Sequence, residues 1–319
     1  MSIRVSDLFI NVAILILLVV PGFLFERAGK STPRMAKGLS DLVLYAAQPA
    51  LIVSAYIRPF DAEILVRAAW VAGYSILAHI LFYGIACLIY RKRGDNTAQV
   101  RVLRYATVFT NAGYMGIPLI TMLCGGEAAI YASVYVAVFN IFCWTLGCFI
   151  YTEDRAYMLP RSAVMNPSFF AIAAGLVCFL TPLGGLLCEV RIVTGVIEML
   201  QSTVAPLAMF IIGMGLAHLD LRRAFLDSKL YLYLAVRMLL SPALVWAIMR
   251  LVALTGIGMS DDTTVITVML LLSATPAATA TAMFAEKFDG DSSYAGKLVA
   301  LSTILAVGTM PLVALLLKV

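Results

Sequence analysis

Ten long apolar runs dominate this sequence of 319 residues and leave little chain between them. Each run is near or above the ~20 residues that an α-helix needs to cross the hydrocarbon core of a bilayer. Hydrophobic residues make up 62% of the chain and charged residues 13%, whereas soluble domains have about 45–50% and ~25%. This composition excludes a soluble globular protein, a disordered chain and a nucleic-acid-binding module. It predicts an all-α polytopic membrane protein with ten transmembrane helices.

The runs are continuous, which distinguishes them from the ~10-residue alternating segments of an outer-membrane β-barrel. No small-residue cleavage site follows the first run, so we expect a retained helix and not a signal peptide. The ten predicted spans are Leu8–Phe25, Ala36–Tyr56, Ile64–Tyr90, Val102–Cys124, Ala128–Tyr151, Pro167–Leu187, Val193–Leu219, Ser228–Ile257, Thr264–Phe288 and Tyr294–Leu317.

Lysine and arginine are distributed unevenly between alternate loops, and this asymmetry predicts the orientation of the chain. If the N-terminus lies outside, five basic residues fall on the outer side and sixteen on the cytoplasmic side. The cytoplasmic set is Arg27, Lys30, Arg34, Lys37, Arg91, Lys92, Arg93, Arg101, Arg104, Arg155, Arg161, Arg222, Arg223, Lys229, Lys287 and Lys297. We therefore predict that both termini are extracytoplasmic, in a bacterial cytoplasmic (inner) membrane. The net charge of +5 then reflects orientation and not an acidic partner.

Matching positions in the two halves of the chain indicate an internal repeat. The loop Thr152–Asn166 divides the predicted spans into five and five, so the two halves run in opposite directions across the membrane. Three pairs recur at nearly one spacing: Pro49 and Pro206 at 157 residues, Pro118 and Pro276 at 158, and His79 and Arg237 at 158. This offset predicts two inverted five-helix repeats, 1–151 and 167–319, joined by the linker 152–166.

The fourth and ninth predicted spans contain residues that interrupt helices. Gly113, Gly116 and Pro118 lie in the fourth span, and Thr275 and Pro276 lie in the ninth. Proline removes a backbone donor and clashes with the preceding turn, and such residues can also be simple packing kinks. Interrupted helices at corresponding positions of two halves point to a transporter binding site. The N-termini of half-helices carry partial positive charge, which favours a bound carboxylate.

No Asp or Glu lies deep in a predicted span, because Asp41, Glu63, Glu198, Asp220 and Glu286 all lie near span ends. Without intramembrane carboxylates, cation exchange is disfavoured. Asn111 and Asn140 could hold a carboxylate or form interhelical hydrogen bonds. Arg237 could neutralise an anionic substrate or extend toward the cytoplasm, and His79 is more typical of a packed helix contact. Two histidines and six scattered cysteines predict neither a metal site nor a cofactor.

Three segments resemble the auxin efflux carrier family. They are Asn111-Ala-Gly-Tyr-Met-Gly-Ile-Pro-Leu119, Ala205-Pro-Leu-Ala-Met-Phe-Ile-Ile-Gly-Met-Gly-Leu216 and Met283-Phe-Ala-Glu-Lys-Phe288. The resemblance extends over essentially the whole chain. The short loop Thr152–Asn166 is similar to that of compact prokaryotic members, whereas the related plant auxin transporters often have a long central loop.

The resemblance implies a fold like that of bile-acid symporters and sodium–proton antiporters, with broken helices 4 and 9 crossing each other. A scaffold domain, 8–56 and 167–219, would form a homodimer. A transport domain, 64–151 and 228–317, would move by an elevator mechanism. Asn111, Pro118 and Pro276 match the family's crossover residues. Asn140 falls at a helix-5 polar position where plant relatives often have glutamine.

The sequence thus predicts a secondary transporter of small organic anions and not an enzyme, because neither G-x-S-x-G nor H-E-x-x-H occurs. Mono- or dicarboxylates such as malonate or malate, or auxin-like acids, are the substrates that the resemblance implies. A sodium- or proton-coupled symporter of another solute, or an anion channel, remains an alternative. The expected partners are the substrate, the bilayer and a second copy of the chain, with no nucleic acid. The predicted site residues are Asn111, Gly113, Gly116, Pro118, Asn140, Arg237, Thr275 and Pro276.

Overall fold

The computed structural model describes residues 4–32, 34–91, 97–158, 167–219, 228–256 and 262–317, which are helical apart from short connections and one isolated β-bridge. The predicted linker is described only as far as Met158, and the basic residues Lys92, Arg93, Arg161, Arg222 and Arg223 lie outside the described residues. The helices are α1 (Val5–Leu17), α2 (Val19–Arg27), α3 (Met35–Leu42), η1 (Val43–Ala47), α4 (Gln48–Tyr56), α5 (Ala62–Ile89), α6 (Thr97–Val108), η2 (Ala112–Gly116), α7 (Ile117–Cys124), α8 (Gly126–Phe142), η3 (Cys143–Gly147), α9 (Cys148–Thr152), η4 (Arg155–Met158), α10 (Pro167–Leu180), α11 (Leu183–Glu189), α12 (Arg191–Ser202), α13 (Val204–Leu216), α15 (Ser228–Ala235), η6 (Val236–Leu240), α16 (Ser241–Ala253), α17 (Thr263–Ala274), α18 (Ala280–Lys287) and α19 (Ser292–Leu317).

Seven helices in the described part of the chain are long and apolar enough to cross a bilayer, which makes this an all-helical polytopic membrane protein. They are Ser6–Arg27, Met35–Tyr56, Ala62–Ile89, Gly126–Thr152, Arg191–Leu216, Leu230–Ala253 and Ser292–Leu316. The pair α10 and α11 is an eighth candidate, bent by 94°. The predicted span Pro167–Leu187 therefore corresponds to a bent pair in the structure. Pro182 lies at the bend, directly before α11, where its missing N–H interrupts the helix.

The remaining two predicted spans are interrupted helices. Val102–Cys124 divides at Phe109–Asn111, between α6 and η2, and Thr264–Phe288 divides at Thr275–Thr279, between α17 and α18. The second break contains Pro276, as predicted. The first break precedes the glycine- and proline-containing stretch, so the prediction that Pro118 interrupts this helix is wrong.

Widened helical turns explain how prolines fit inside continuous helices. The turns η1, η2 and η6 are π-helical, and each ends two residues before a proline, respectively Pro49, Pro118 and Pro242. A proline ring clashes with the carbonyl group four residues earlier and offers it no donor. A π-turn inserts one extra residue and carries the carbonyl away from the ring. Pro118 consequently lies in an unbroken run from η2 into α7.

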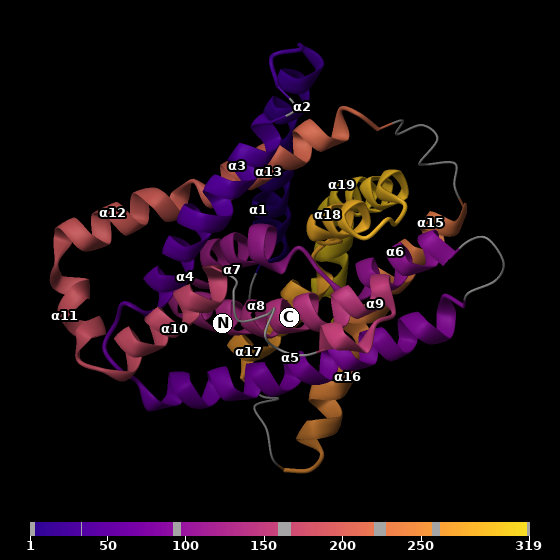
Figure 1. Ribbon diagram of the computed structural model, residues 1–319. Coiled ribbons are helices and arrows are strands. Elements are labelled where there is room, and N and C mark those ends of the chain that lie inside the picture. The colour runs from indigo at the N-terminus through magenta and orange to yellow at the C-terminus, as the bar shows by residue number, and fades with distance from the viewer. Residues whose placement is uncertain are drawn as a thin grey trace.

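Close backbone contacts hold α2 against α13. A Cβ atom on Gly22 would lie 2.0 Å from the Phe210 carbonyl oxygen, and one on Gly213 would lie 2.1 Å from the Val19 carbonyl oxygen. Only glycine permits such an approach, which is typical of packed membrane helices. Beside this pair, α4 packs on α10 and α12; these three helices lie together on the left of Figure 1.

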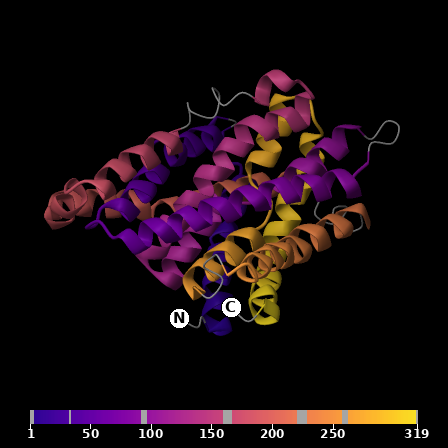
Figure 2. The same cartoon turned by 90° about the horizontal axis from the view of Figure 1, so that it is seen from below.

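A second set of contacts joins α5 to α8, α16 to α17, and α18 to α19. An ion-pair cluster ties three of these helices at one end. Arg67 of α5 contacts Asp262 at 2.7 Å and Glu127 of α8 at 3.2 Å, and Asp262 caps the first turn of α17. The helix α1 packs against α19, so the first and last helices of the described chain lie side by side, at the lower edge of Figure 2.

Candidate functional site

The two helix breaks meet as an antiparallel pair of extended segments. Thr110 and Ala277 form the isolated β-bridge. The Asn111 N–H donates to the Pro276 carbonyl at 2.8 Å, and the Ala278 N–H donates to the Phe109 carbonyl at 3.1 Å. Non-helical backbone at membrane depth persists only where protein or a watery cavity surrounds it, and here each break satisfies the other. We call this arrangement, 109–111 with 275–279, the crossing.

Two helix N-termini leave the crossing. The run from η2 into α7 begins after Asn111, and α18 begins after Thr279. No side chain caps either N-terminus with a hydrogen bond. Uncapped N–H groups and the aligned peptide dipoles give both ends partial positive charge. The crossing therefore presents two sites of positive potential without a charged side chain.

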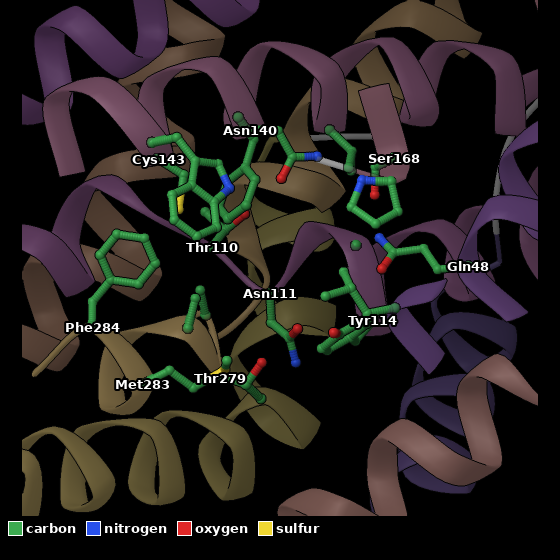
Figure 3. Close-up of a pocket in the computed structure, with 18 of the residues that line it drawn as sticks. Gln48, Thr110, Asn111, Tyr114, Asn140, Cys143, Ser168, Thr279, Met283 and Phe284 are labelled. Atoms are coloured by element: carbon green, nitrogen blue, oxygen red, sulfur yellow. The ribbon is translucent and has the colours of Figure 1, made fainter. Parts of the chain in front are cut away.

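A cavity of about 490 Å³ opens at these N-termini. One wall comes from α3, η1, α4 and the start of α10, and the opposite wall comes from the crossing, α8, η3 and α18 (Figure 3). Its lining is mainly apolar and aromatic: Leu44, Tyr45, Tyr114, Val136, Phe139, Trp144, Met283 and Phe284. Its polar lining residues are Asp41, Gln48, Thr110, Asn111, Asn140, Ser168, Thr279 and Lys287.

Asn111 and Asn140 both line this cavity. The Asn111 side chain is 3% exposed, and its Nδ2 atom is buried without a hydrogen-bond partner among the described residues. Asn140 lies in the last two turns of α8, on the same wall. Figure 3 shows the two side chains on separate segments of the chain, Asn140 above the crossing and Asn111 extending from it. Amide groups in such a position can donate to an anion entering the cavity.

The other predicted site residues of the broken helices have different surroundings. Gly113 lines the cavity, whereas Gly116 faces α17, where a Cβ atom would lie 2.5 Å from Leu272 Cδ2. Pro118 is buried in α7 and does not line the cavity. Thr275 and Pro276 form backbone of the crossing and are also absent from the lining. Thr275 and Pro276 therefore stabilise the crossing through their backbone, and neither residue lines the cavity.

Arg237 lies behind the crossing and outside the cavity lining. Its side chain is 0% exposed, its Nη2 donates to the Thr275 carbonyl at 3.2 Å, and its guanidinium stands 5.8 Å from the Phe82 ring. The Nε and Nη1 atoms have no hydrogen-bond partner, and no carboxylate pairs with Arg237 within the described ranges. Thr275 follows the last residue of α17, so this cation faces the negative end of a helix dipole.

One helix supplies donors to both C-terminal ends at the crossing. Tyr233 lies one turn before Arg237, and its hydroxyl donates to the Ala106 carbonyl at 3.4 Å, in the last turn of α6.

His79 is likewise buried outside the cavity, with Nδ1 2.7 Å from the Ser75 carbonyl and its ring stacked on Phe142. Among the described residues, no Asp or Glu is buried and no cluster suited to a metal ion occurs.

Several cavity residues were not predicted from the sequence. Gln48, Ser168 and Thr279 contribute polar groups, and five aromatic side chains form much of the walls. The sequence signal for Gln48 is a polar residue inside an apolar run, directly before Pro49. The aromatic residues have no distinguishing pattern, because similar residues face lipid and the protein interior throughout the chain.

Comparison with known proteins gives a family match in two halves. The family model described as "Membrane transport protein" matches residues 7–166 and 158–314, so the matches divide within the predicted linker. An "Uncharacterized transporter" of Methanothermobacter thermautotrophicus is 24% identical over 309 residues, which cover 96% of each chain. A "Putative malonate transporter" of Rhizobium meliloti is 24% identical over 316 residues, which cover 92% of this chain and 90% of the relative.

Proposed function

We propose that this chain carries small organic anions through the cavity at the crossing. It belongs to the membrane transport protein family, which is the family of the auxin efflux carriers, and it is therefore a secondary transporter. One observation carries this proposal. Two uncapped helix N-termini begin at the cavity, and Asn111, whose Nδ2 has no hydrogen-bond partner among the described residues, is part of its lining. Backbone N–H groups, helix dipoles and neutral amides together form a site suited to a carboxylate.

The proposed substrates are mono- or dicarboxylates such as malonate or malate, or auxin-like acids. The Rhizobium meliloti relative has malonate in its name, which supports the dicarboxylate assignment. The aromatic walls support an acid with an apolar body, because those side chains offer contact surface and no competing charge. No carboxylate is buried in the described residues, and Asp41, the acidic residue of the cavity lining, is accompanied there by the basic Lys287, so the charged lining does not favour a cation.

We further propose ten spans arranged as two inverted five-helix repeats, with α6–α7 and α17–α18 as the crossed broken helices 4 and 9. In this arrangement 8–56 and 167–219 form a scaffold that dimerises, and 64–151 and 228–317 form a transport domain that moves against it as an elevator. The close packing of α2 on α13, and of α4 on α10 and α12, supports a rigid scaffold. The protein would lie in a bacterial cytoplasmic membrane with both termini outside.

A second cavity supports alternating exposure of the site. It has a volume of about 200 Å³ and lies at the other ends of α4 and α8, among Ser54, Gly126 and Gln201. The main cavity extends instead toward Lys287 and Pro167. The two cavities therefore occupy opposite ends of the interface between the proposed scaffold and transport domain.

Ligand binding to purified protein tests the assignment. A carboxylate that binds only the folded state raises the melting temperature with its concentration, and malonate, malate and phenylacetate are suitable probes. We expect Asn111→Ala to abolish saturable binding while the protein remains folded and monodisperse. Asn11→Ala is the control, because Asn11 bonds to the Asp7 carbonyl in α1, far from the crossing in the sequence. Unchanged affinity in Asn111→Ala would reject the site.

Flux measurements distinguish the proposed carrier from the alternatives. In liposomes containing the purified protein, a carrier gives saturable uptake and countertransport, in which an outward gradient of unlabelled anion drives uptake of labelled anion, whereas a channel gives no countertransport. Uptake with and without a sodium or proton gradient then identifies a coupled symporter.

A further inference from the structure

Gln48 provides a third amide at the cavity, from the wall opposite Asn111 and Asn140. It is the first residue of α4, directly after the widened turn η1 and before Pro49. Figure 3 shows its side chain extending from that helix toward the centre of the site. The proline thus has a local consequence: the turn that accommodates it also sets the direction of the preceding side chain.

The Gln48 side chain is buried yet makes no hydrogen bond within the described ranges. Its relative exposure is 5%, and the residue is part of the cavity lining. A primary amide offers two donors and one acceptor. Other polar groups on the same span have partners: Ser40 bonds the Ala36 carbonyl, and Ser54 bonds the Leu51 carbonyl and Gln201. An amide that lines a cavity without a protein partner has its donors and its acceptor available to water or a ligand in the cavity.

Gly113 allows this amide to approach the other wall. A Cβ atom on Gly113 would lie 2.9 Å from Gln48 Nε2, closer than a carbon and a nitrogen normally pack. Its next neighbours, Gln48 Cδ and Val136 Cγ1, would be 4.0 Å away. The missing side chain at 113 therefore leaves room for the Gln48 amide at the start of η2, two residues from Asn111.

We propose that Gln48 is a carboxylate ligand that acts together with Asn111 and Asn140. This inference rests on the proposed function, because it assigns a further residue to the same anion site. The Gln48 N–H groups donate to one face of the carboxylate, and the amides and helix N-termini of the crossing donate to the other. The bound acid then bridges α4 of the proposed scaffold and the crossing of the proposed transport domain.

Binding and stability measurements on the full-length protein distinguish a ligand from a structural residue. The probes are malonate, malate and phenylacetate. Gln48→Met keeps the length of the side chain and removes its donors, so we expect the dissociation constant to rise about tenfold. Gln48→Glu places a negative charge in the site and abolishes binding. The melting temperature of ligand-free Gln48→Met does not fall, because the amide it lacks has no protein partner, whereas a structural residue would lower it.

Gln201→Met is the matched control, because it makes the same change on the scaffold at the second cavity. We expect its affinity to equal that of the wild type. Gly113→Ala gives an independent test: it weakens binding in the wild-type background by displacing the Gln48 amide. In the Gln48→Ala background the added methyl group meets no atom nearer than 4.0 Å and has little further effect.

The outcomes separate this inference from the function on which it rests. If the wild type binds none of the three acids, the anion-carrier proposal fails and the role of Gln48 fails with it. If Asn111→Ala loses binding but Gln48→Met binds as tightly as the wild type, the carrier proposal stands and the role of Gln48 is overturned. A fall in the ligand-free melting temperature of Gln48→Met together with unchanged affinity also overturns it.

Discussion

Replacing Arg237 by methionine tests whether a buried cation acts on the anion site from outside the cavity. The guanidinium has one hydrogen bond, to the Thr275 carbonyl, and no carboxylate partner in the described residues. Desolvating such a charge costs several kcal/mol, and apolar replacements of buried charges are often neutral or stabilising by about 1–4 kcal/mol. We therefore expect Arg237→Met to remain folded, with a melting temperature equal to or above that of the wild type.

The expected loss lies in anion affinity. From Arg237 the contacts lead through the Thr275 carbonyl, at 3.2 Å, and along Pro276 to the Asn111 N–H, at 2.8 Å from the Pro276 carbonyl. With one residue step between them, the path is about 10 Å long. At an effective dielectric constant of ~20, two unit charges at that distance attract by about 1.7 kcal/mol. Loss of the cation then weakens binding of a monoanion roughly 15-fold, and of a dianion by more.

Equilibrium titration of malonate and phenylacetate into purified protein measures this effect. Arg250→Met serves as the control, because Arg250 is the exposed arginine of the same span and stacks over Trp246. Arg237→Lys should keep most of the affinity, since the charge and not the shape of the guanidinium carries the effect. The reasoning is refuted if Arg237→Met binds both acids as tightly as the wild type, or if Arg250→Met loses affinity to the same degree.

Two further predictions concern the framework around the site. Gly213→Ala places a methyl group 2.1 Å from the Val19 carbonyl oxygen and forces α2 away from α13. This change should lower the free energy of unfolding, measured in a thermal or denaturant melt, by about 1–3 kcal/mol. The control Gly215→Ala should be neutral, because its methyl group would meet nothing within 4 Å. Arg67→Met removes the ion pair with Asp262, and because the arginine is partly exposed we expect a loss of about 1 kcal/mol that shrinks in high salt. Equal melting temperatures for the two glycine variants, or a salt-independent loss at Arg67, would contradict these expectations.

The positions of the helix breaks show what could be predicted from the sequence. Interruptions in the fourth and ninth spans were predictable, because glycine, proline and small polar residues gather there in an otherwise apolar chain. The exact residues of the two breaks could not be predicted. A proline can break a helix, as Pro276 does, or it can be accommodated by a π-turn, as Pro118 is. Packing decides between these outcomes. The 158-residue spacing of the two prolines consequently does not pair the two breaks, which meet at Thr110 and Ala277.

The second feature that the sequence did not predict is the direction in which a side chain points from its helix. Hydropathy placed Arg237 inside a span, but a helix that is apolar around most of its circumference does not reveal which face meets the cavity. Arg237 was therefore included among the predicted site residues, as a weaker candidate than Asn111 and Asn140, although it lies behind the crossing. Gln48 was missed for the complementary reason. Its importance depends on the absence of a side chain at Gly113, on a helix far away in the sequence.

The crossing explains how an anion site can form without a cation among its closest groups. Tyr233 and Arg237 donate to the C-terminal ends of α6 and α17, while the N-terminal ends of η2 and α18 stay uncapped toward the cavity. Countering the negative ends and exposing the positive ones leaves positive potential at the two helix N-termini of the crossing. A carboxylate held by this potential and by neutral amides forms no direct ion pair. Its departure leaves no unpaired charge in the cavity wall at the crossing, which suits a site that must release its ligand in every transport cycle.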